Sequence, residues 1–263
     1  MPILKINDVD LYYETYGQGF PLVFISGFTA DHSMWELLVG AYSHKYQVII
    51  FDNRGAGKSS DKPDYPYTAQ VMADDTIGLL KALELPQAHF IGHSFGSCVA
   101  QTIALKYPTY VKSIVLSNTL LRAHARLLLF SDTRFDLIKA EMPAAVITKL
   151  NLAMGYSNKF LSVSGRIEQI TKIAPPAMTV QGYQHQFDGL KAFDSRNWVG
   201  DIKKPCLLIC ADEDLLADMA DSQFIEKSIK EAEFFCFKNV GHVPMFEHPD
   251  IFNEVILQFL AKY

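Results

Sequence analysis

The stretch that decides the fold is Ile91-Gly92-His93-Ser94-Phe95-Gly96-Ser97-Cys98, which contains the pattern G-x-S-x-G. Residues 88–91 are typical of a short buried strand, and the apolar face that carries Val99 and Ile103 is typical of a helix. A strand that runs directly into a helix turns so tightly that only glycines fit around the turn. The turn exposes the hydroxyl of Ser94 near the positive end of the helix, so we predict a nucleophile there rather than a structural turn serine.

Length and composition describe one globular domain with an insertion. The chain has 263 residues, of which 20% are charged, and a formal net charge of −5, which does not suggest a nucleic-acid-binding protein. Residues 1–8 lack the features of a secretion signal, and no stretch approaches the roughly 18 apolar residues of a membrane span. The four cysteines show no zinc-type spacing, so we expect reduced cysteines, no metal and a cytoplasmic protein.

Apolar runs alternate with helical patterns along most of the chain. Residues 2–16 carry a hairpin signal at their centre. The expected later strands are 21–25, 46–51, 88–91, 111–117, 205–211 and 232–237, and the expected helices include 34–42, 68–83 and 249–261. This alternation predicts an α/β fold with a largely parallel sheet covered by helices on both faces.

Residues 120–198 interrupt this alternation. They hold no convincing buried strand, several short helical patterns and repeated glycine or proline breakers. We therefore predict a core made of residues 1–119 and 199–263, with a helical cap inserted at 120–198. Ten basic and six acidic residues give the cap a net charge of +4.

The loop 52–59 has glycines before Lys58-Ser59 and superficially resembles a phosphate-binding loop. That motif needs a glycine five residues before Gly57, where Asp52 stands, and a dinucleotide fingerprint lacks its third glycine. We expect no nucleotide cofactor. Instead we predict that Asp52 and Arg54 pair and hold a sharp loop beside the elbow.

A serine nucleophile needs a histidine base, and in a strand-elbow-helix arrangement the histidine comes last in the chain. His242 follows the strand 232–237 and lies at the edge where the parallel strands end. His124 and His185 belong to the predicted cap, and His248 borders the last helix. We predict His242 as the base.

The acid that orients the histidine should follow a strand between the serine and the histidine. The strand 205–211 ends in a loop that contains Asp212, Asp214 and Asp218. We predict Asp214 as the acid. The alternatives are Asp212 and Asp218, which we expect to be loop-capping or surface carboxylates.

The oxyanion that develops during acyl transfer needs two backbone donors. One is the N–H of Phe95, at the start of the helix after the elbow. The loop after the strand 21–25 fits the second position, where Phe28 follows the flexible Gly27.

Together these motifs resemble the α/β-hydrolase superfamily, in its branch of small carboxylesterases, lactonases and related enzymes. The resemblance covers nearly the whole chain and implies a mostly parallel central sheet, helices on both faces and an inserted helical cap. The matching motifs are Ser26-Gly27-Phe28 with Trp35, Asp52-x-Arg54-Gly55-x-Gly57-x-Ser59, the elbow at 92–96, Asp214, and Gly241-His242 followed by Glu247-x-Pro249.

Two positions depart from the family pattern. Ser26 stands where histidine usually precedes the oxyanion glycine, and Ala211 stands where glycine is usual. A serine at the elbow also argues against the dehalogenase and epoxide-hydrolase branches, which place aspartate there. The segments 116–119, 181–183 and 194–196 are similar to those of enol-lactone hydrolases.

The resemblance and the residues imply a serine hydrolase that cleaves a small or medium carboxylic ester or lactone through an acyl-enzyme, without a cofactor. Aromatic residues of the cap are candidates for an apolar acyl pocket, although many of them must pack the cap itself. The four selected candidates are Phe130, Phe135, Tyr156 and Phe187.

Other functions use the same three residues. They are a ligand receptor or signalling protein with slow turnover, a C–C bond hydrolase, and a cofactor-free perhydrolase. The positive cap also suits an anionic substrate or an acidic acyl-carrier partner, as in an acyl-carrier methyl ester esterase. The sequence indicates no nucleic-acid partner and gives no oligomeric state.

Overall fold

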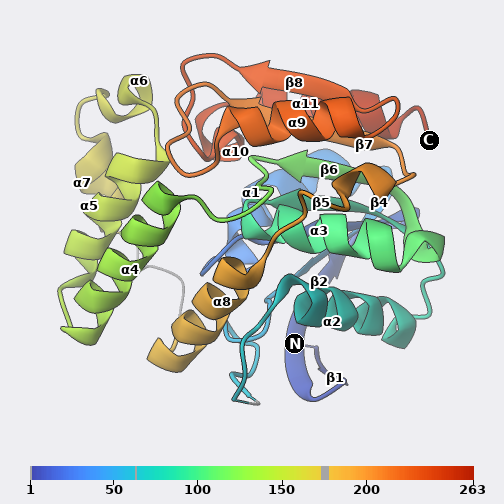
Figure 1. Cartoon of the computed structure of the whole chain (residues 1–263), viewed down its shortest axis with the longest axis horizontal. Helices are drawn as coiled ribbons and strands as arrows, with labels where there is room; N and C mark the ends of the chain where they lie inside the picture. Colours follow the sequence, from blue (N-terminus) through green and yellow to red (C-terminus); the bar gives the residue numbers. More distant parts are fainter. Residues whose placement is uncertain (1, 63, 173–177) are drawn as a thin grey trace.

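The computed structural model describes residues 2–62, 64–172 and 178–263. Its centre is an eight-stranded sheet with the strand order β1-β2-β4-β3-β5-β6-β7-β8, in which the first two strands run antiparallel to their neighbours and the others are parallel (Figure 1). The strands are β1 (Ile3–Ile6), β2 (Val9–Tyr16), β3 (Phe20–Ile25), β4 (Tyr46–Phe51), β5 (Ala88–His93), β6 (Val111–Ser117), β7 (Cys206–Ala211) and β8 (Glu233–Phe237). The prediction of a mostly parallel α/β sheet is confirmed.

The sheet opens with a hairpin whose turn is encoded locally. Ile6 pairs with Val9, so Asn7 and Asp8 form the connection. Asn7 has a φ of 53°, the left-handed conformation that asparagine adopts more readily than most residues. The predicted antiparallel pair is therefore present and extends the sheet at one edge.

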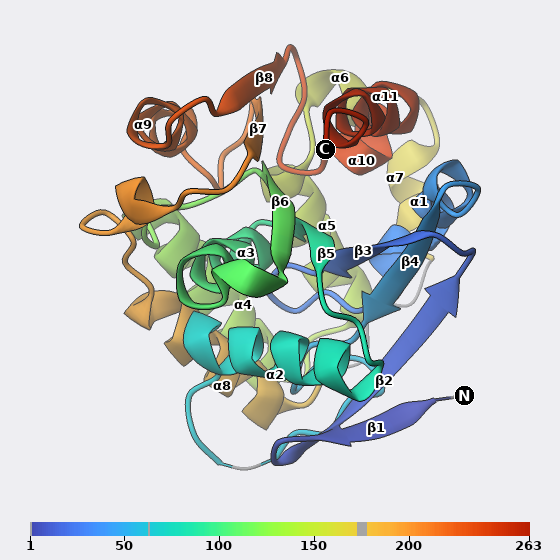
Figure 2. The ribbon, with the colours of Figure 1, turned by 90° about the vertical axis from the view of Figure 1, so that its right-hand side faces the viewer.

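Helices cover both faces of the sheet (Figure 2). One face carries α2 (Ala69–Ala82), α3 (Phe95–Lys106) and α9 (Met219–Ser228), and the other carries α1 (Ser33–Tyr42) and α11 (Pro249–Leu260). Short elements complete the core, namely the 3₁₀ helices η1 (Pro108–Tyr110) and η2 (Val199–Asp201), and α10 (Pro244–Glu247). In the described ranges no helix is both long and apolar enough to cross a membrane.

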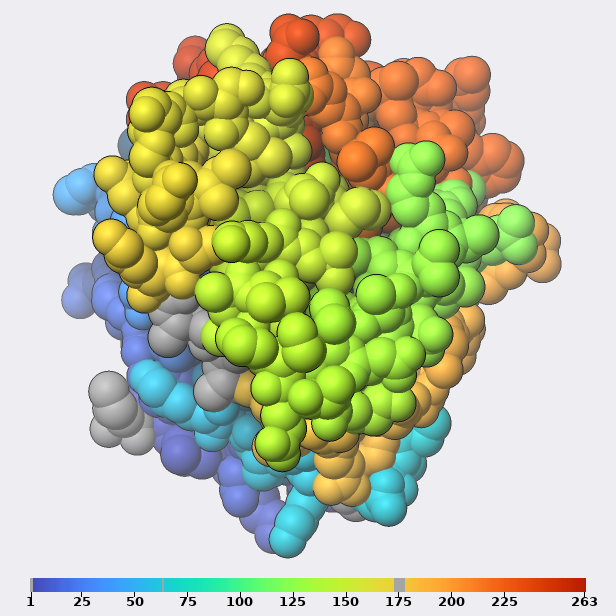
Figure 3. Space-filling view, turned by 90° about the vertical axis from the view of Figure 1, so that its left-hand side faces the viewer, coloured from blue at the N-terminus to red at the C-terminus, as the bar shows by residue number. Residues whose placement is uncertain are grey.

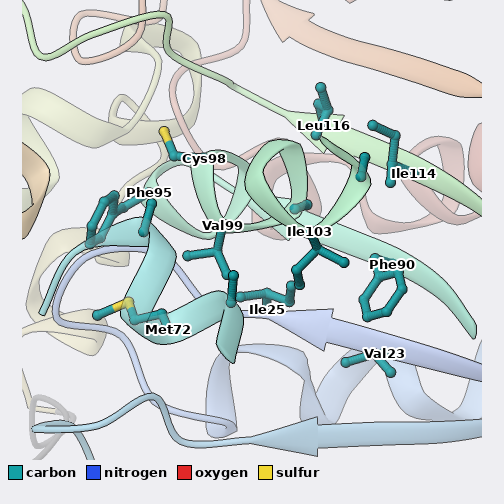
Figure 4. Close-up of a cluster of buried hydrophobic side chains, with 14 of the residues drawn as sticks. Val23, Ile25, Met72, Phe90, Phe95, Cys98, Val99, Ile103, Ile114 and Leu116 are labelled. Carbon is teal, nitrogen blue, oxygen red and sulfur yellow. The ribbon is translucent and has the colours of Figure 1, made fainter. Parts of the chain in front are cut away.

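Alternation along the strands divides the core into two clusters. On β5, Phe90 packs toward α2 and α3, whereas Ile91 packs toward α1 and α11. Figure 4 shows the first cluster, in which Val99 and Ile103 of α3 lie between Met72 of α2 and the strands. Residues buried on both faces explain why the strands appear as continuous apolar runs in the sequence.

Between β6 and β7 the chain leaves the sheet and forms a layer of helices over one end of the molecule (Figures 1 and 3). These helices are α4 (Ala125–Lys139), α5 (Ala144–Gly155), α6 (Asn158–Leu161), α7 (Arg166–Ile170) and α8 (Val180–Ala192). The predicted breaker Pro143 precedes α5, and Gly165, with a φ of 75°, precedes α7. The breakers Pro175-Pro176 lie outside the described residues.

The two ends of this insertion meet at a narrow neck. The backbone N–H of Ser195 donates to the carbonyl of Leu121 over 2.9 Å, and Arg122 forms an antiparallel bridge with Asp194. The neck falls inside 120–198, the range that we propose for the cap.

The predicted pairing of Asp52 with Arg54 is wrong. The buried Arg54 donates from Nε to Asp75 over 2.5 Å and from Nη2 to Asp8 over 2.9 Å. Asp52 accepts from the backbone N–H of His32 at 2.7 Å instead. Each charge finds its partner in another segment, because a buried charge requires donors or acceptors placed around it in three dimensions.

The loop is nevertheless sharp, and a glycine makes it so. Gly57 has a φ of 56°, and a Cβ at this position would lie 2.3 Å from Oδ2 of Asp52. The N–H of Lys58 donates to the same oxygen over 2.8 Å. Asp52 therefore organises the loop through the backbone rather than through Arg54.

Candidate active site

Ser94 lies on a strained turn between β5 and α3. Its φ of 53° and ψ of −122° are unusual for a serine, and its N–H donates to the carbonyl of Ser117 over 2.9 Å. A Cβ at Gly92 would lie 2.3 Å from the carbonyl oxygen of Gly96, and one at Gly96 would lie 2.2 Å from that of Ile25. The two glycines are therefore steric requirements of the elbow.

A buried histidine–aspartate pair lies at the same edge of the sheet. Nδ1 of His242 is 2.8 Å from Oδ2 and 2.9 Å from Oδ1 of Asp214. Asp214 also accepts from Nδ2 of Asn118 at 2.7 Å and from the backbone N–H groups of Leu216 and Ala217 at 2.8 and 2.9 Å. These donors fix the carboxylate, which in turn orients the imidazole.

His93 connects this pair with the elbow. It precedes Ser94 in the chain, and its ring centroid lies 4.8 Å from that of His242. Burial, with a smaller effect of the charge of His242, lowers the pKa of His93 well below its ordinary value. A neutral His93 therefore packs against His242.

The other carboxylates after β7 serve local structure. Asp212 accepts from the N–H of Asn239 over 2.6 Å, and Asp218 caps α9 by accepting from the N–H of Ala220 over 2.9 Å. Neither contacts His242 among the interactions of the described residues. These roles agree with the predicted loop-capping alternatives.

The other candidate histidines lie in different surroundings. His124 pairs with Asp221 at 2.9 Å, and His185 pairs with Asp64 at 2.8 Å. His248 is the residue that precedes the first turn of α11. Among the described histidines that follow the elbow, His242 lies at the carboxyl edge of the sheet, where Ser94 and Asp214 also lie.

The loop after β3 packs directly against the elbow. A Cβ at Gly27 would lie 3.2 Å from the Cβ of Ser94 and 3.1 Å from the carbonyl oxygen of His93. Phe28 follows in the same loop, and Phe95 is the first residue of α3, where no carbonyl within the helix can accept its N–H. Phe95 thus follows Ser94 directly in the chain, and Phe28 follows Gly27, which packs against Ser94.

Ser26 supports this loop in place of the usual histidine. Its Oγ accepts from the indole Nε1 of Trp35 over 3.0 Å and donates to the carbonyl of Asp31 over 3.1 Å. The side chain of Asn53 donates to the carbonyl of Ser26 over 3.0 Å. The departure at Ser26 therefore leaves the loop anchored on both sides.

Two of the four predicted pocket aromatics lie in a cluster around Phe28. Phe187 stacks on Phe28 with ring centroids 6.0 Å apart, and Tyr183 contacts Phe28 at 4.8 Å. Phe135 stacks on Tyr183 at 5.2 Å. These rings form an aromatic cluster beside the loop after β3.

The remaining two aromatics lie elsewhere. Phe130 packs against the core cluster that contains α3. Tyr156 stacks on Phe160 at 4.8 Å, but its backbone is close to the histidine loop, because the N–H of His242 donates to the carbonyl of Gly155 over 2.8 Å. The cap thus contacts the loop that carries the candidate base.

Several residues around this site make contacts that were not predicted from the sequence. Asn118 directly follows β6 at the edge where catalytic groups gather, and this position could have identified it. Glu247 accepts from the N–H groups of Gly241 and Ser157, each over 2.9 Å, and so joins the histidine loop to the cap. The contact of Arg134 with Thr29 could not be predicted from local sequence, because the two residues are 105 positions apart in the chain.

One cluster of the described residues has the composition of a cation site. Nε2 of His32 lies 3.7 Å from Glu14 and 3.8 Å from Glu36, and its Nδ1 is 2.7 Å from Asp52. Glu14 lies on β2, His32 directly precedes α1, Glu36 lies in α1, and Asp52 follows β4. Among the interactions of the described residues, none of the four contacts the histidine–aspartate pair.

The fold and the arrangement at the strand ends define a class of protein. A family model described as the α/β hydrolase fold matches residues 21–249, and the chain belongs to this family. The chain is 28% identical over 264 residues to a protein of Azorhizobium caulinodans named "Putative carbamate hydrolase RutD", covering 100% of this chain and 99% of that protein.

Two further relatives are similar over their full length. The 3-oxoadipate enol-lactonase 2 of Acinetobacter baylyi is 27% identical over 265 residues, which cover 99% of this chain and 96% of that protein. The crystal structure of the enol-lactonase from Burkholderia xenovorans LB400 superposes with a TM-score of 0.89 at 24% identity, covering 99% and 100% of the two chains. The chain is thus similar to these hydrolases over nearly all of the compared lengths.

Proposed function

We propose that this protein is a serine hydrolase that cleaves a small or medium carboxylic ester or lactone. The observation that carries the proposal is the buried His242–Asp214 pair at the strand ends, with His242 packed on His93 beside the strained Ser94. A nucleophile on an elbow, a base and an orienting carboxylate are the parts that acyl transfer requires. The similarity to enol-lactonases supports the same chemistry.

In this proposal Oγ of Ser94 attacks the carbonyl carbon while Nε2 of His242 takes the hydroxyl proton. Asp214 holds the Nδ1–H of His242 and stabilises the imidazolium. The N–H groups of Phe28 and Phe95 stabilise the oxyanion of the tetrahedral intermediate.

Collapse of this intermediate breaks the bond to the leaving oxygen, which receives the proton from His242. Water, deprotonated by His242, then attacks the acyl-enzyme, and a second collapse releases the acid and returns the proton to Ser94. The three side chains, the two backbone donors and one water molecule suffice for both steps of the reaction.

A carbamate is a second candidate substrate, because relatives of this chain carry names that refer to carbamate hydrolysis. The same residues would form a carbamoyl-enzyme on Ser94 in place of an acyl-enzyme. Parallel assays with an ester, a lactone and a carbamate of the same size would rank the three classes.

Ser94 is the proposed nucleophile. Replacing it in the Ser94→Ala variant should lower kcat on p-nitrophenyl esters by roughly 10⁴-fold or more, because the remaining groups have no nucleophile to activate. A series of acyl lengths gives the size of the pocket. Ser164→Ala, at an exposed serine of the cap, is the matched control and should keep its rate.

Labelling with a fluorophosphonate provides a second readout, since the wild type should gain the mass of one phosphonyl group and Ser94→Ala should not. An unchanged rate in Ser94→Ala would contradict the proposal. A single slow turnover with saturable binding would favour the receptor alternative. Cleavage of C–C bonds alone, activity only with hydrogen peroxide as the acyl acceptor, or activity only on an acyl-carrier ester would each assign the corresponding alternative function to the same residues.

A further inference from the structure

Arg134 of α4 reaches from the cap to the oxyanion loop. Its Nη1 donates to Oγ1 of Thr29 over 2.7 Å, and its guanidinium carbon lies 5.4 Å from the ring centroid of Tyr183. Its Nε is enclosed, and no acceptor in the described part of the chain reaches it. Arg134 is therefore a half-buried cation with one enclosed, unused donor.

The other arginine with buried donors, Arg54, has acidic partners, whereas Arg134 has none among the described residues. Arg54 is fully buried, and Asp75 and Asp8 neutralise it and hold its pKa above the ordinary value. Burial lowers the pKa of Arg134, and among the described residues no carboxylate pairs with it. The residues outside the described ranges have no acidic side chains. An enclosed guanidinium N–H without an acceptor among the described residues is available to an anion from outside them.

The position of Arg134 connects that partner to the candidate active site. Thr29 directly follows Phe28, whose N–H is the proposed oxyanion donor. Thr29 has a φ of 65°, and its backbone N–H donates a hydrogen bond to Oε1 of Gln186 over 2.9 Å. The ring of Tyr183 below the guanidinium contacts Phe28. A ligand whose anionic group binds Arg134 would thus extend past Tyr183 and Phe28 toward Ser94.

We propose that Arg134 binds a carboxylate at the far end of the acyl group, so that the preferred substrates are esters or lactones that carry one remote carboxylate. A planar guanidinium can present Nε and one Nη to both oxygens of a carboxylate. This inference rests on the proposed function and specifies its substrate class.

The test compares monomethyl glutarate with the methyl ester of glutaric half-amide, a neutral molecule of nearly the same shape. The wild type should favour the acid in kcat/KM by about 10- to 100-fold, the effect of a hydrogen-bonded charge in a buried site. Arg134→Gln should abolish this preference, and Arg134→Lys should retain part of it. The readout is the ratio of the two substrates, so a general loss of rate does not affect it.

Arg126→Gln is the matched control, because Arg126 is an exposed arginine of the same helix and its loss changes the net charge equally. Its ratio should equal that of the wild type. A ratio near one in the wild type, or an equal fall in Arg126→Gln and Arg134→Gln, would overturn the inference. So would a preference that disappears in high salt, because salt screens surface charges far more than buried ones.

Binding to Ser94→Ala by calorimetry separates this inference from the proposed hydrolysis. Tighter binding of the acid than of the half-amide supports the role of Arg134 even if neither compound is hydrolysed. Equal binding contradicts it even if neutral p-nitrophenyl esters are cleaved in a Ser94-dependent way.

Discussion

Individual residues at this site are held by neighbours that do not take part in the chemistry. Asp214 receives its side-chain hydrogen bond from Asn118, which lies at the end of β6 rather than on the loop of the acid. Asn118 has a φ of 49°, so the backbone as well as the side chain is specialised. We regard Asn118 as a positioning residue that acts through Asp214.

The variant Asn118→Gly tests this role, because glycine tolerates the left-handed backbone and removes only the side chain. We expect kcat to fall by about 10- to 100-fold, the effect of losing a hydrogen bond to a charged group, with KM nearly unchanged. Steady-state kinetics on one ester check this. Asn158→Gly, at an exposed asparagine of the cap, is the control, and a rise in KM with unchanged kcat would contradict a positioning role.

At the scale of elements, α8 is joined to the core by close backbone contact. A Cβ at Gly189 would lie 1.9 Å from the carbonyl oxygen of Tyr67, and one at Gly182 would lie 2.4 Å from that of Gly55. The N–H of Tyr67 also donates to the carbonyl of His185 over 2.9 Å. The helix that carries Phe187 therefore has little freedom to move away from the core.

Gly189→Ala should destabilise the protein by about 1–3 kcal/mol, because the added methyl group overpacks a rigid backbone contact. Urea unfolding at neutral pH measures this. Gly40→Ala gives the opposite expectation, since Gly40 lies in α1 with nothing within 4 Å of its Cβ position, and alanine there should stabilise by roughly 0.5–1 kcal/mol. Equal stability of Gly189→Ala and the wild type would show that the contact is soft.

At the scale of the whole molecule, two buried histidines of β5 make stability depend on pH. Burial is the main cause that lowers the pKa of His89 to about 4 and that of His93 well below its ordinary value. An unfolded histidine titrates near 6.5, so below this pH the unfolded chain binds protons that the native chain excludes. Stability should therefore fall as the pH drops through about 6.5.

The slope should reach up to about 1.4 kcal/mol per pH unit for each histidine that stays neutral. Urea unfolding at pH 7 and at pH 5 measures it, and His89→Gln should show a shallower decline than the wild type. His44→Gln, at an exposed histidine, should keep the wild-type slope. Parallel curves for His89→Gln and the wild type would contradict the assignment.

Much of the fold could be predicted because the sequence encodes it locally. The strands 46–51 and 111–117 have the predicted bounds, and Thr68 caps α2 by accepting from the N–H of Val71. Continuous apolar runs, capping side chains and the glycines of the elbow each act within a few residues. Patterns of this range also led to the prediction of Ser94, Asp214 and His242, of which His242 and Asp214 are hydrogen-bonded.

The remainder depends on contacts between distant segments. Arg54 was assigned to a neighbour two residues away but pairs with Asp75, and Arg134 reaches Thr29 from another layer of the molecule. The register of the cap helices over the core determines which aromatics surround Phe28. Local patterns in one sequence do not contain that register.

The neck at Leu121 and Ser195 has an evolutionary consequence. The insertion leaves and re-enters the core at hydrogen-bonded neighbours, and β6 and β7 pair directly with each other. Recombination at these two points would transfer the whole insertion in one event, so that Arg134, Tyr183 and Phe187 would move together. If the insertion binds the substrate as we propose, exchange of this one segment would change the substrate range and leave the residues at the strand ends in place.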